Sequence, residues 1–407
     1  MKDTNRSLSK NSRKLTFLMV FLLLSLSCAS QPKNKALPPI QTGAMQTSIY
    51  LPLLKGKKVG LVVNQTATIG QQYLIDSLLQ LGIKVSAIFA PEHGFRGEAE
   101  AGAEIKDGRD PKTGVRVVSL YGNKKKPGSD DLKDLEVLVF DIQDVGARFY
   151  TYISTLHYVM EACAEHNLPL LIFDRPNPNG HYVDGPVLDT AFRSFVGMHP
   201  IPVVHGMTIG EYAGMIAGEK WLPKGLKCDF SVIKMVAYTH NRQYDLPVAP
   251  SPNLPNMHAI YLYPSICFFE GTPVSLGRGT EKPFQQIGAP WFNTGSSTFT
   301  PVAIAGKALN PPFKNEKCGG YDLSKEPLEK WEQLGQIRLD WLLEFYAASP
   351  DKSKFFTPFF DKLAGTDELR KQIIAGRTEA QIRQSWQADL SAYKITRSKY
   401  LLYPDFK

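Results

Sequence analysis

The stretch Val85-Ser-Ala-Ile-Phe-Ala-Pro-Glu-His-Gly-Phe-Arg-Gly97 decides the fold of this chain. Its first half is an apolar run that predicts a buried strand. The strand must stop at Pro91, which has no N–H to donate to a sheet. Glu92, His93 and Arg96 follow directly, with glycines between them. Loops at the carboxyl ends of strands line the ligand crevice in open α/β sheets, so we expect this loop to carry function.

Similar apolar runs with polar exits recur along the first 235 residues. Strands are predicted at 57–63, 115–120, 136–140, 168–173, 201–204 and 230–235, and helices at 73–81, 151–166 and 208–221. This alternation predicts a Rossmann-like, mostly parallel sheet with helices on both faces. Five strands end in polar residues, namely Asn64, Glu92, Asp141–Asp144, Asp174–Asn177 and His205. We therefore expect one cleft along the carboxyl edge of the sheet.

The pattern changes at 249–257, which is too rich in proline for a helix or a central strand. We place a domain boundary near 255–262. It divides a catalytic domain at 46–258 from a smaller α+β domain at 259–407. Amphipathic helices are predicted in the second domain at 337–349, 367–375 and 379–393.

The N-terminus has the pattern of an export signal. Five Lys and Arg residues precede an apolar run at 15–26, which is too short to cross a bilayer comfortably. A small residue stands directly before Cys28, as in bacterial lipoproteins, where that cysteine becomes lipidated; cleavage after Ser30 is the alternative. We expect 1–28 to be a signal peptide, 29–45 a flexible tether, and the mature protein to be periplasmic or anchored to a membrane through its lipid alone.

Charge and cysteine content exclude several classes of protein. Loss of the signal, with its five basic residues and one Asp, lowers the formal net charge from +8 to +4. That is an ordinary balance, so we predict no nucleic-acid partner. The four remaining cysteines show neither CxxC nor Cys/His ligand spacing, and we expect free thiols rather than structural zinc.

The polar edge lacks the signatures of several common chemistries. No GxGxxG, P-loop, GxSxG elbow or HxxxH pair is present, so we predict neither a nucleotide cofactor nor a metal. What remains is carboxylate, Arg, Asn and aromatic side chains, which suits carbohydrate. Glycoside hydrolysis needs a carboxylic acid to protonate the leaving oxygen, and usually a second carboxylate on the other face of the sugar.

Six blocks of sequence, in order from about residue 50 to the C-terminus, resemble the exo-β-N-acetylmuramidase family. They are Pro91-Glu-His-Gly-Phe-Arg-Gly97, Gln143-Asp-Val-Gly-Ala-Arg-Phe-Tyr-Thr-Tyr152, Asp174-Arg-Pro-Asn-Pro178, His205-Gly-Met-Thr208, Pro250-Ser-Pro-Asn253, and Glu270-Gly-Thr272 with Gly277-Arg-Gly-Thr280. The resemblance implies a Rossmann-like catalytic domain, a smaller C-terminal domain, and an active site between them. It also implies release of β-1,4-linked N-acetylmuramic acid from the non-reducing end of peptidoglycan fragments.

The resemblance implies roles for single residues as well. Glu92 is the expected general acid, and the alternative is a carboxylate paired with Arg96. Asp144 and Glu270 are both candidates for the second carboxylate, although each could instead hold a glycine-rich loop. Candidates for the lactyl carboxylate of muramic acid are three arginines, Arg148, Arg175 and Arg278. Expected substrate contacts are His93, Asn177, His205 and Asn253, where the asparagines could equally fix turns.

Two other functions stay open. An exo-glycosidase for a related amino sugar, such as N-acetylglucosamine, would need no arginine for a substrate carboxylate. A non-catalytic sugar-binding lipoprotein would keep its binding after Glu92→Gln. The fold alone does not separate these possibilities. Thr208 and Glu211 have the spacing of a capping box, so we interpret Glu211 as a helix cap rather than a catalytic residue.

Overall fold

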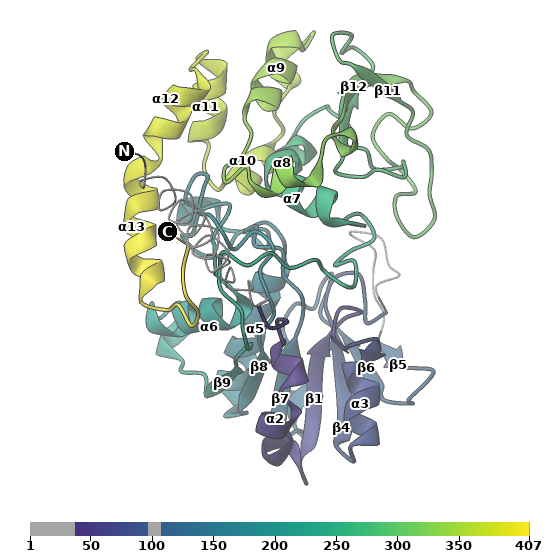
Figure 1. The fold of residues 1–407 in the computed structure, drawn as a ribbon, viewed down its shortest axis with the longest axis vertical. Helices are drawn as coiled ribbons and strands as arrows, with labels where there is room; N and C mark the ends of the chain where they lie inside the picture. Colours follow the sequence, from purple (N-terminus) through teal and green to yellow (C-terminus); the bar gives the residue numbers. More distant parts are fainter. Residues whose placement is uncertain (1–36, 97–106, 407) are drawn as a thin grey trace, which may run out of the picture. The chain divides into compact units, whose positions relative to one another are not determined.

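The computed structural model describes residues 37–96 and 107–406. Ile40–Lys407 form one compact unit, in which a sheet domain is followed by a smaller C-terminal domain (Figure 1). The predicted signal peptide, Cys28 and the first part of the predicted tether lie outside the described residues. Among the described residues, no helix is long and apolar enough to cross a membrane.

Seven strands form the main sheet: β1 (Lys58–Val63), β4 (Lys84–Ala90), β5 (Gly108–Arg109), β6 (Arg116–Ser119), β7 (Val137–Asp141), β8 (Leu170–Phe173) and β9 (Phe230–Ile233). Their order is β5-β6-β4-β1-β7-β8-β9, and only the β5–β6 pair is antiparallel. The chain runs outward from β1 to β4 and β6, then returns to the other side of β1 with β7. Such a reversal opens a crevice at the carboxyl ends of the strands beside it.

Helices cover both faces of this sheet. The main ones are α2 (Thr47–Leu54) and α3 (Leu74–Gln80) on one face, and α5 (Tyr152–His166) and α6 (Ile209–Gly218) on the other. Neighbouring residues of β1 belong to different cores, because Leu61 packs with residues of α2 and α3 while Val62 packs with residues of α5 and α6. The period of two in a strand explains why every apolar residue of β1 is buried.

Two sequence predictions in this domain are wrong. Residues 201–204 form no strand of the sheet, because Val203 O accepts a hydrogen bond from Arg148 N and Val204 bridges only to loop residues. The tether ends earlier than predicted, since Gln41 exchanges two backbone hydrogen bonds with Val236, at 3.1 and 3.0 Å. Residues 41–45, which include η1 (Gly43–Met45), therefore belong to the folded body.

The C-terminal domain combines a small antiparallel sheet with short helices. Its strands are β10 (Gln286–Ala289), β11 (Ser297–Phe299) and β12 (Cys318–Asp322), in the order β10-β12-β11. Its helices are α7 (Met257–Ile266), η4 (Cys267–Gly271), η5 (Leu323–Lys325), α8 (Leu328–Glu332), α9 (Asp340–Ala348), η6 (Lys352–Lys354), α10 (Pro358–Ala364), α11 (Glu368–Ile374), α12 (Glu379–Ser385) and α13 (Gln387–Ser398). The helix predicted at 379–393 is interrupted at Trp386.

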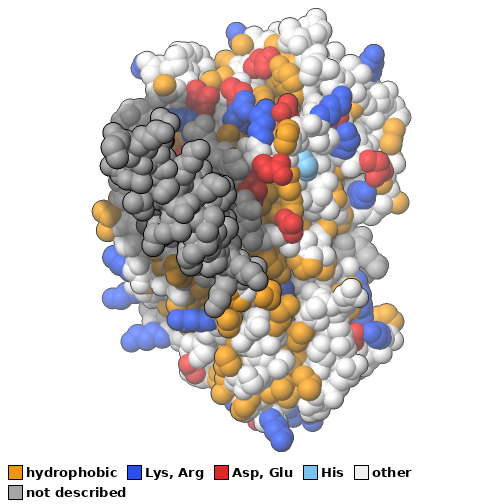
Figure 2. Space-filling view, in the orientation of Figure 1, with side chains coloured by type: hydrophobic (Ala, Val, Ile, Leu, Met, Phe, Trp, Pro, Cys, Tyr) orange, Lys and Arg blue, Asp and Glu red, His pale blue; other side chains and the backbone are white. Residues whose placement is uncertain are grey.

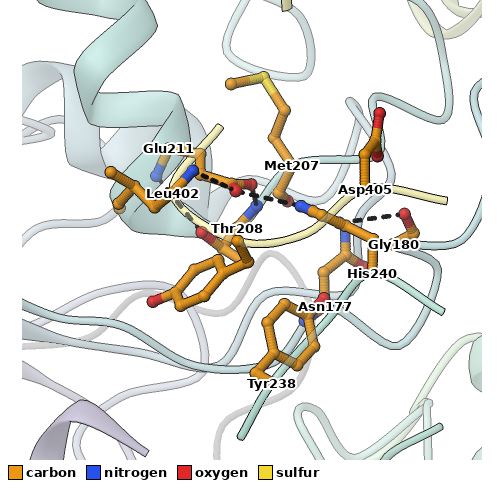
Figure 3. A network of polar contacts seen from close by, with 12 residues as sticks. Asn177, Gly180, Met207, Thr208, Glu211, Tyr238, His240, Leu402 and Asp405 are labelled. Atoms are coloured by element: carbon orange, nitrogen blue, oxygen red, sulfur yellow. Dashed lines mark hydrogen bonds and ion pairs between the residues drawn. The ribbon is translucent and has the colours of Figure 1, made fainter. Parts of the chain in front are cut away.

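The end of the chain returns to the sheet domain. Thr208 and Glu211 form the predicted capping box of α6, with Thr208 N donating to Glu211 Oε2 at 2.9 Å. The other oxygen of this buried carboxylate lies 3.0 Å from His240 Nε2 and accepts from Leu402 N at 2.9 Å (Figure 3). Arg397 of α13 donates to Gly206 O. The cap of α6 thus also holds the C-terminal segment.

The surface carries charges of both signs. On the face drawn in Figure 2, acidic and basic side chains are interspersed over the upper half, and apolar side chains gather over the lower half. Exposed apolar residues include Ile49 and Leu53 of α2. The cysteines at 163, 228, 267 and 318 are free thiols, and only Cys228 is partly exposed.

Candidate active site

A cavity of about 210 Å³ follows the carboxyl ends of β4 and β7, and both domains line it. Its polar lining consists of Glu92, His93, Thr151, Ser251, Asn253, Glu270 and Arg278. Its aromatic lining consists of Tyr121, Phe149, Tyr150, Tyr152, Phe195, Tyr263, Phe284 and Phe359. Two carboxylates, a guanidinium and several aromatic rings therefore meet in one space, which is the combination expected for a sugar.

Glu92 stands in a tight turn directly after β4. Gly94 N donates to Pro91 O at 3.0 Å and closes the turn. His93 has a φ of 71°, in the left-handed region that non-glycine residues rarely occupy. Such conformations persist only where the surrounding structure enforces them, and they cluster at functional sites. The local backbone therefore fixes the position of Glu92 at the cavity.

One oxygen of the Glu92 carboxylate is held by a neighbouring hydroxyl. Thr151 Oγ1 donates to Glu92 Oε2 at 2.8 Å, and no described residue bonds to the other oxygen. The alternative pairing with Arg96 does not form, because Arg96 Nη2 contacts Asp110 Oδ1 at 2.6 Å. As far as the described residues go, this second oxygen is open to a group in the cavity.

Two tyrosines build the adjoining wall. The hydroxyls of Tyr150 and Tyr152 both donate to Pro250 O, at 2.9 and 3.3 Å. Asn64, at the polar exit of β1, donates from Nδ2 to the Tyr152 hydroxyl at 2.8 Å. Burial, and then the charge of Glu92, raises the pKa of Tyr152, so its hydroxyl stays protonated at neutral pH. Asn64 and the tyrosines therefore fix the shape of the wall.

Glu270 and Arg278 bring opposite charges to the cavity from the C-terminal domain. Arg278 Nη2 and Nε contact Glu270 Oε1 at 2.5 and 3.1 Å. The guanidinium also lies over the Phe284 ring, 5.1 Å from its centre. Burial opposes the charge of the guanidinium, but the attraction of Glu270 outweighs it and raises the pKa of Arg278. Both side chains keep about a quarter of their surface exposed, at 24% and 21%.

Asn253 presents an unsatisfied oxygen at the same cavity. Its Nδ2 donates to Lys307 O at 3.0 Å, whereas its buried Oδ1 has no hydrogen-bond partner among the described residues. Buried polar atoms normally have partners, so a lone oxygen in a cavity lining indicates a position for a water or a ligand group.

Asp144 and His205 lie together, but outside the cavity lining. Asp144 Oδ2 accepts from Gly146 N at 2.7 Å and lies 3.6 Å from His205 Nε2. Asp144 Oδ1 and His205 Nε2 are buried without hydrogen-bond partners in the described part of the chain. Of the two candidates for the second carboxylate, the structure therefore places Glu270 in the cavity lining and Asp144 outside it.

The structure places Arg148 away from the cavity. The side chain is completely buried, and its guanidinium donates to the carbonyls of Pro186, Ile201, Leu363 and Ala364 at 2.7–2.9 Å. These carbonyls belong to both domains. Arg148 therefore joins the domains, and we correct its predicted role as a contact for the lactyl carboxylate.

Arg175 and Asn177 also have structural partners. Arg175 forms a buried, two-pronged ion pair with Asp141, at 2.5 and 2.8 Å. Asn177 Nδ2 donates to Met207 O, and its Oδ1 accepts from Asn179 N, which fixes the turn. Neither side chain lines the cavity. Of the predicted substrate contacts, His93, Asn253 and Arg278 remain at the site.

Sequence reasoning missed several lining residues. Thr151 lies between two tyrosines at the start of α5, directly after the polar exit of β7, and its position in that exit was a usable signal. Phe359 had no such signal, because it reaches the cavity from α10 of the other domain. Among the described residues, no group of His, Cys, Asp and Glu side chains is arranged to hold a metal ion.

Two crystal structures of DUF1343 family proteins from Bacteroides fragilis share this architecture. One aligns with a TM-score of 0.84 at 49% sequence identity, and the other with a TM-score of 0.75 at 29% identity. Each alignment covers 90% of this chain and 100% of the other. The likeness extends over both domains, so the cavity between them belongs to a fold that other proteins share.

Sequence comparison identifies the family more specifically than the shared fold does. The peptidoglycan β-N-acetylmuramidase NamZ of Bacillus subtilis (strain 168) is 39% identical over 412 residues, which are 96% of this chain and 98% of that protein. Residues 59–258 match the model of the N-terminal domain of exo-β-N-acetylmuramidase NamZ, and residues 261–403 match the model of its C-terminal domain. This chain therefore belongs to the exo-β-N-acetylmuramidase family.

Proposed function

We propose that this protein is an exo-acting glycoside hydrolase that releases β-1,4-linked N-acetylmuramic acid from the non-reducing end of peptidoglycan fragments. Family membership supports the reaction class. The observation that carries the proposal is the meeting of Glu92 and Glu270, from different domains, in one aromatic cavity. Its volume of about 210 Å³ lies below the roughly 300–1,000 Å³ of typical ligand pockets, which suits one terminal sugar rather than a long chain.

Glu92 acts as the general acid in this proposal. It protonates the glycosidic oxygen as the bond to the anomeric carbon breaks, so the leaving sugar departs as a neutral alcohol. Thr151 is a positioning residue, because its hydrogen bond to Oε2 sets the direction of the carboxyl group. The turn that contains His93 fixes the backbone next to Glu92, and so also helps to hold the carboxyl group in place.

Glu270 is the second carboxylate that the geometry favours. It lines the cavity, whereas Asp144 does not. Beside the developing positive charge at the anomeric carbon, the Glu270 carboxylate stabilises that charge and either attacks or directs a water. Its ion pair with Arg278 orients the carboxylate toward the cavity.

Arg278 also supports selectivity for muramic acid. Its Nε and Nη2 are bonded to Glu270, and among the described residues no bond reaches Nη1. A guanidinium with an unused face suits the lactyl carboxylate, which N-acetylglucosamine lacks. The lone Oδ1 of Asn253 can accept from a sugar hydroxyl or an acetamido N–H.

We further propose that the protein is exported and held at a membrane through a lipid on Cys28. The support is the basic segment, the apolar run at 15–26 and the small residue before the cysteine. Labelling of cells with a clickable fatty acid, with wild type beside Cys28→Ala, tests this: the label should appear on the wild type only.

A defined tetrasaccharide, MurNAc–GlcNAc–MurNAc–GlcNAc, tests the reaction. We expect mass spectrometry to show one equivalent of N-acetylmuramic acid and a trisaccharide, with no further cleavage because the new end is N-acetylglucosamine. Release of N-acetylglucosamine from a GlcNAc-terminated fragment would instead indicate a different exo-glycosidase. Binding without any cleavage would support the sugar-binding lipoprotein.

A further inference from the structure

A groove on the C-terminal domain shares α10 with the cavity, through different residues of that helix, and has no role in the proposed chemistry. Its volume is about 510 Å³, and its lining includes Tyr346 of α9, Lys352 of η6, Phe356, and Thr357. Helices α9, α10 and α11, which carry part of this lining, lie in the upper part of the view in Figure 1. Arg370 of α11 closes one side through a two-pronged ion pair with Asp361 of α10.

The groove is joined to the cavity through the backbone. Thr357, in the groove, donates from N and Oγ1 to Gly271 O, at 2.9 and 3.2 Å. Gly271 directly follows Glu270, which lines the cavity. A Cβ on Gly271 would lie 2.5 Å from Phe360 Cα, so only glycine permits this close packing of η4 on α10. Phe359, two residues after Thr357, itself lines the cavity.

The groove offers flat aromatic surface and one positive charge. Tyr346 and Phe356 are stacked, with their ring centres 5.4 Å apart and their planes at 26°. The Lys352 ammonium lies 5.6 Å from the centre of the Tyr346 ring. Arg370 is neutralised by Asp361, whereas Lys352 makes no ion pair within the described residues. Aromatic faces pack on sugar rings, and an unpaired ammonium attracts a carboxylate.

We propose that this groove is a second saccharide subsite, which binds the leaving part of the substrate beyond its first sugar. The ligand class is an amino-sugar chain that carries a carboxylate, here the lactyl group of the next muramic acid. The inference rests on the proposed function, because it takes the cavity as the place of the terminal sugar. The aromatic pair holds a ring, and Lys352 meets the carboxylate.

Two substrates of different length distinguish binding at this subsite from binding in the cavity. A nitrophenyl β-N-acetylmuramic acid glycoside occupies the cavity alone, whereas MurNAc–GlcNAc–MurNAc–GlcNAc reaches the groove. We expect Lys352→Ala to lower kcat/KM for the tetrasaccharide about fivefold and to leave the glycoside unchanged, since an exposed charge contact is worth about 1 kcal/mol. Phe356→Leu keeps the apolar packing but loses the flat face, and should give the same pattern. Lys354→Ala, at a neighbouring exposed lysine outside the groove, is the matched control and should alter neither.

Equal effects of Lys352→Ala on both substrates, or no effect on either, would overturn the proposal. If the wild type turned over neither compound, the proposed hydrolase function would be refuted, but the subsite proposal would still need its own test. The subsite would then be decided by calorimetric titration of the tetrasaccharide, in which Lys352→Ala must weaken binding about fivefold and Lys354→Ala must not.

Discussion

Replacing Arg148 with methionine tests whether this arginine serves the fold or the substrate. The side chain is completely buried, and it donates to the carbonyls of Pro186 and Ile201 and to those of Leu363 and Ala364 at the end of α10. Methionine has a similar length but no donor. All four carbonyls would therefore lose their charged partner while they stay buried.

Two opposing effects determine how much Arg148→Met lowers the free energy of unfolding. Ile201 O keeps its hydrogen bond from Leu188 N, so three carbonyls are left without a donor, and at about 2 kcal/mol each they cost about 6 kcal/mol. Against this, burial lowers the pKa of Arg148 to about 9 from its ordinary value of 12.5. That shift corresponds to about 5 kcal/mol of desolvation cost, which methionine does not carry. The lost hydrogen bonds outweigh this gain, and we expect a net loss of about 1 kcal/mol.

Thermal unfolding and kinetics measure the two possible roles separately. For a body of this size, a loss of about 1 kcal/mol should lower the unfolding midpoint by about 1 °C. The KM for a β-N-acetylmuramic acid glycoside should not change. Arg278→Met should show the opposite pattern, with a higher KM and a nearly unchanged midpoint. Normal stability together with a raised KM in Arg148→Met would refute this reasoning. If the methionine variant does not fold, the same two measurements are made on Arg148→Lys, which keeps the charge.

Two further predictions concern Thr151 and Asp174. Thr151→Val removes the donor to Glu92 Oε2, so kcat/KM should fall about three- to tenfold while Thr151→Ser restores it; wild-type rates in the valine variant would contradict the positioning role. Burial raises the pKa of Asp174 to about 6 from its ordinary 3.8, so the folded state holds this proton more tightly than the unfolded state does. Stability should therefore fall by about 3 kcal/mol as pH rises from about 4 to 6, as followed by urea unfolding, and Asp174→Asn should remove that part of the slope.

Much of the sheet domain could be predicted from local sequence. The apolar run at 85–90 and Pro91 define β4 and the turn that carries Glu92. The same rule found β1, β7 and β8 to within about two residues. It failed at 201–204, where an apolar run is buried between loops rather than in the sheet. Burial alone gives the same hydrophobic pattern in both cases, and strand pairing is decided by distant residues.

The site was less predictable, because it depends on which polar side chains are enclosed. Arg148 and Arg278 both looked suitable as contacts for a carboxylate. The neighbours of Arg148, Ala147 and Phe149, are buried, and the glycines on either side of Arg278 are buried as well, so the local sequence did not separate the two arginines. Only the tertiary structure places Arg278 in the cavity lining. Phe359 could not be predicted at all, since its contact with the cavity requires the docking of α10 on η4.

The most direct test of the central claim compares Glu92→Gln on two leaving groups. A general acid matters most when the leaving group is a poor one, so kcat/KM for MurNAc–GlcNAc should fall by about 10²–10⁴. For a nitrophenyl β-N-acetylmuramic acid glycoside, whose leaving group needs little protonation, the loss should be much smaller. Glu281→Gln, at an exposed glutamate on the neighbouring loop, is the control and should match the wild type on both. Equal losses on the two substrates, or full activity of Glu92→Gln on the disaccharide, would contradict the assignment of Glu92 as the acid.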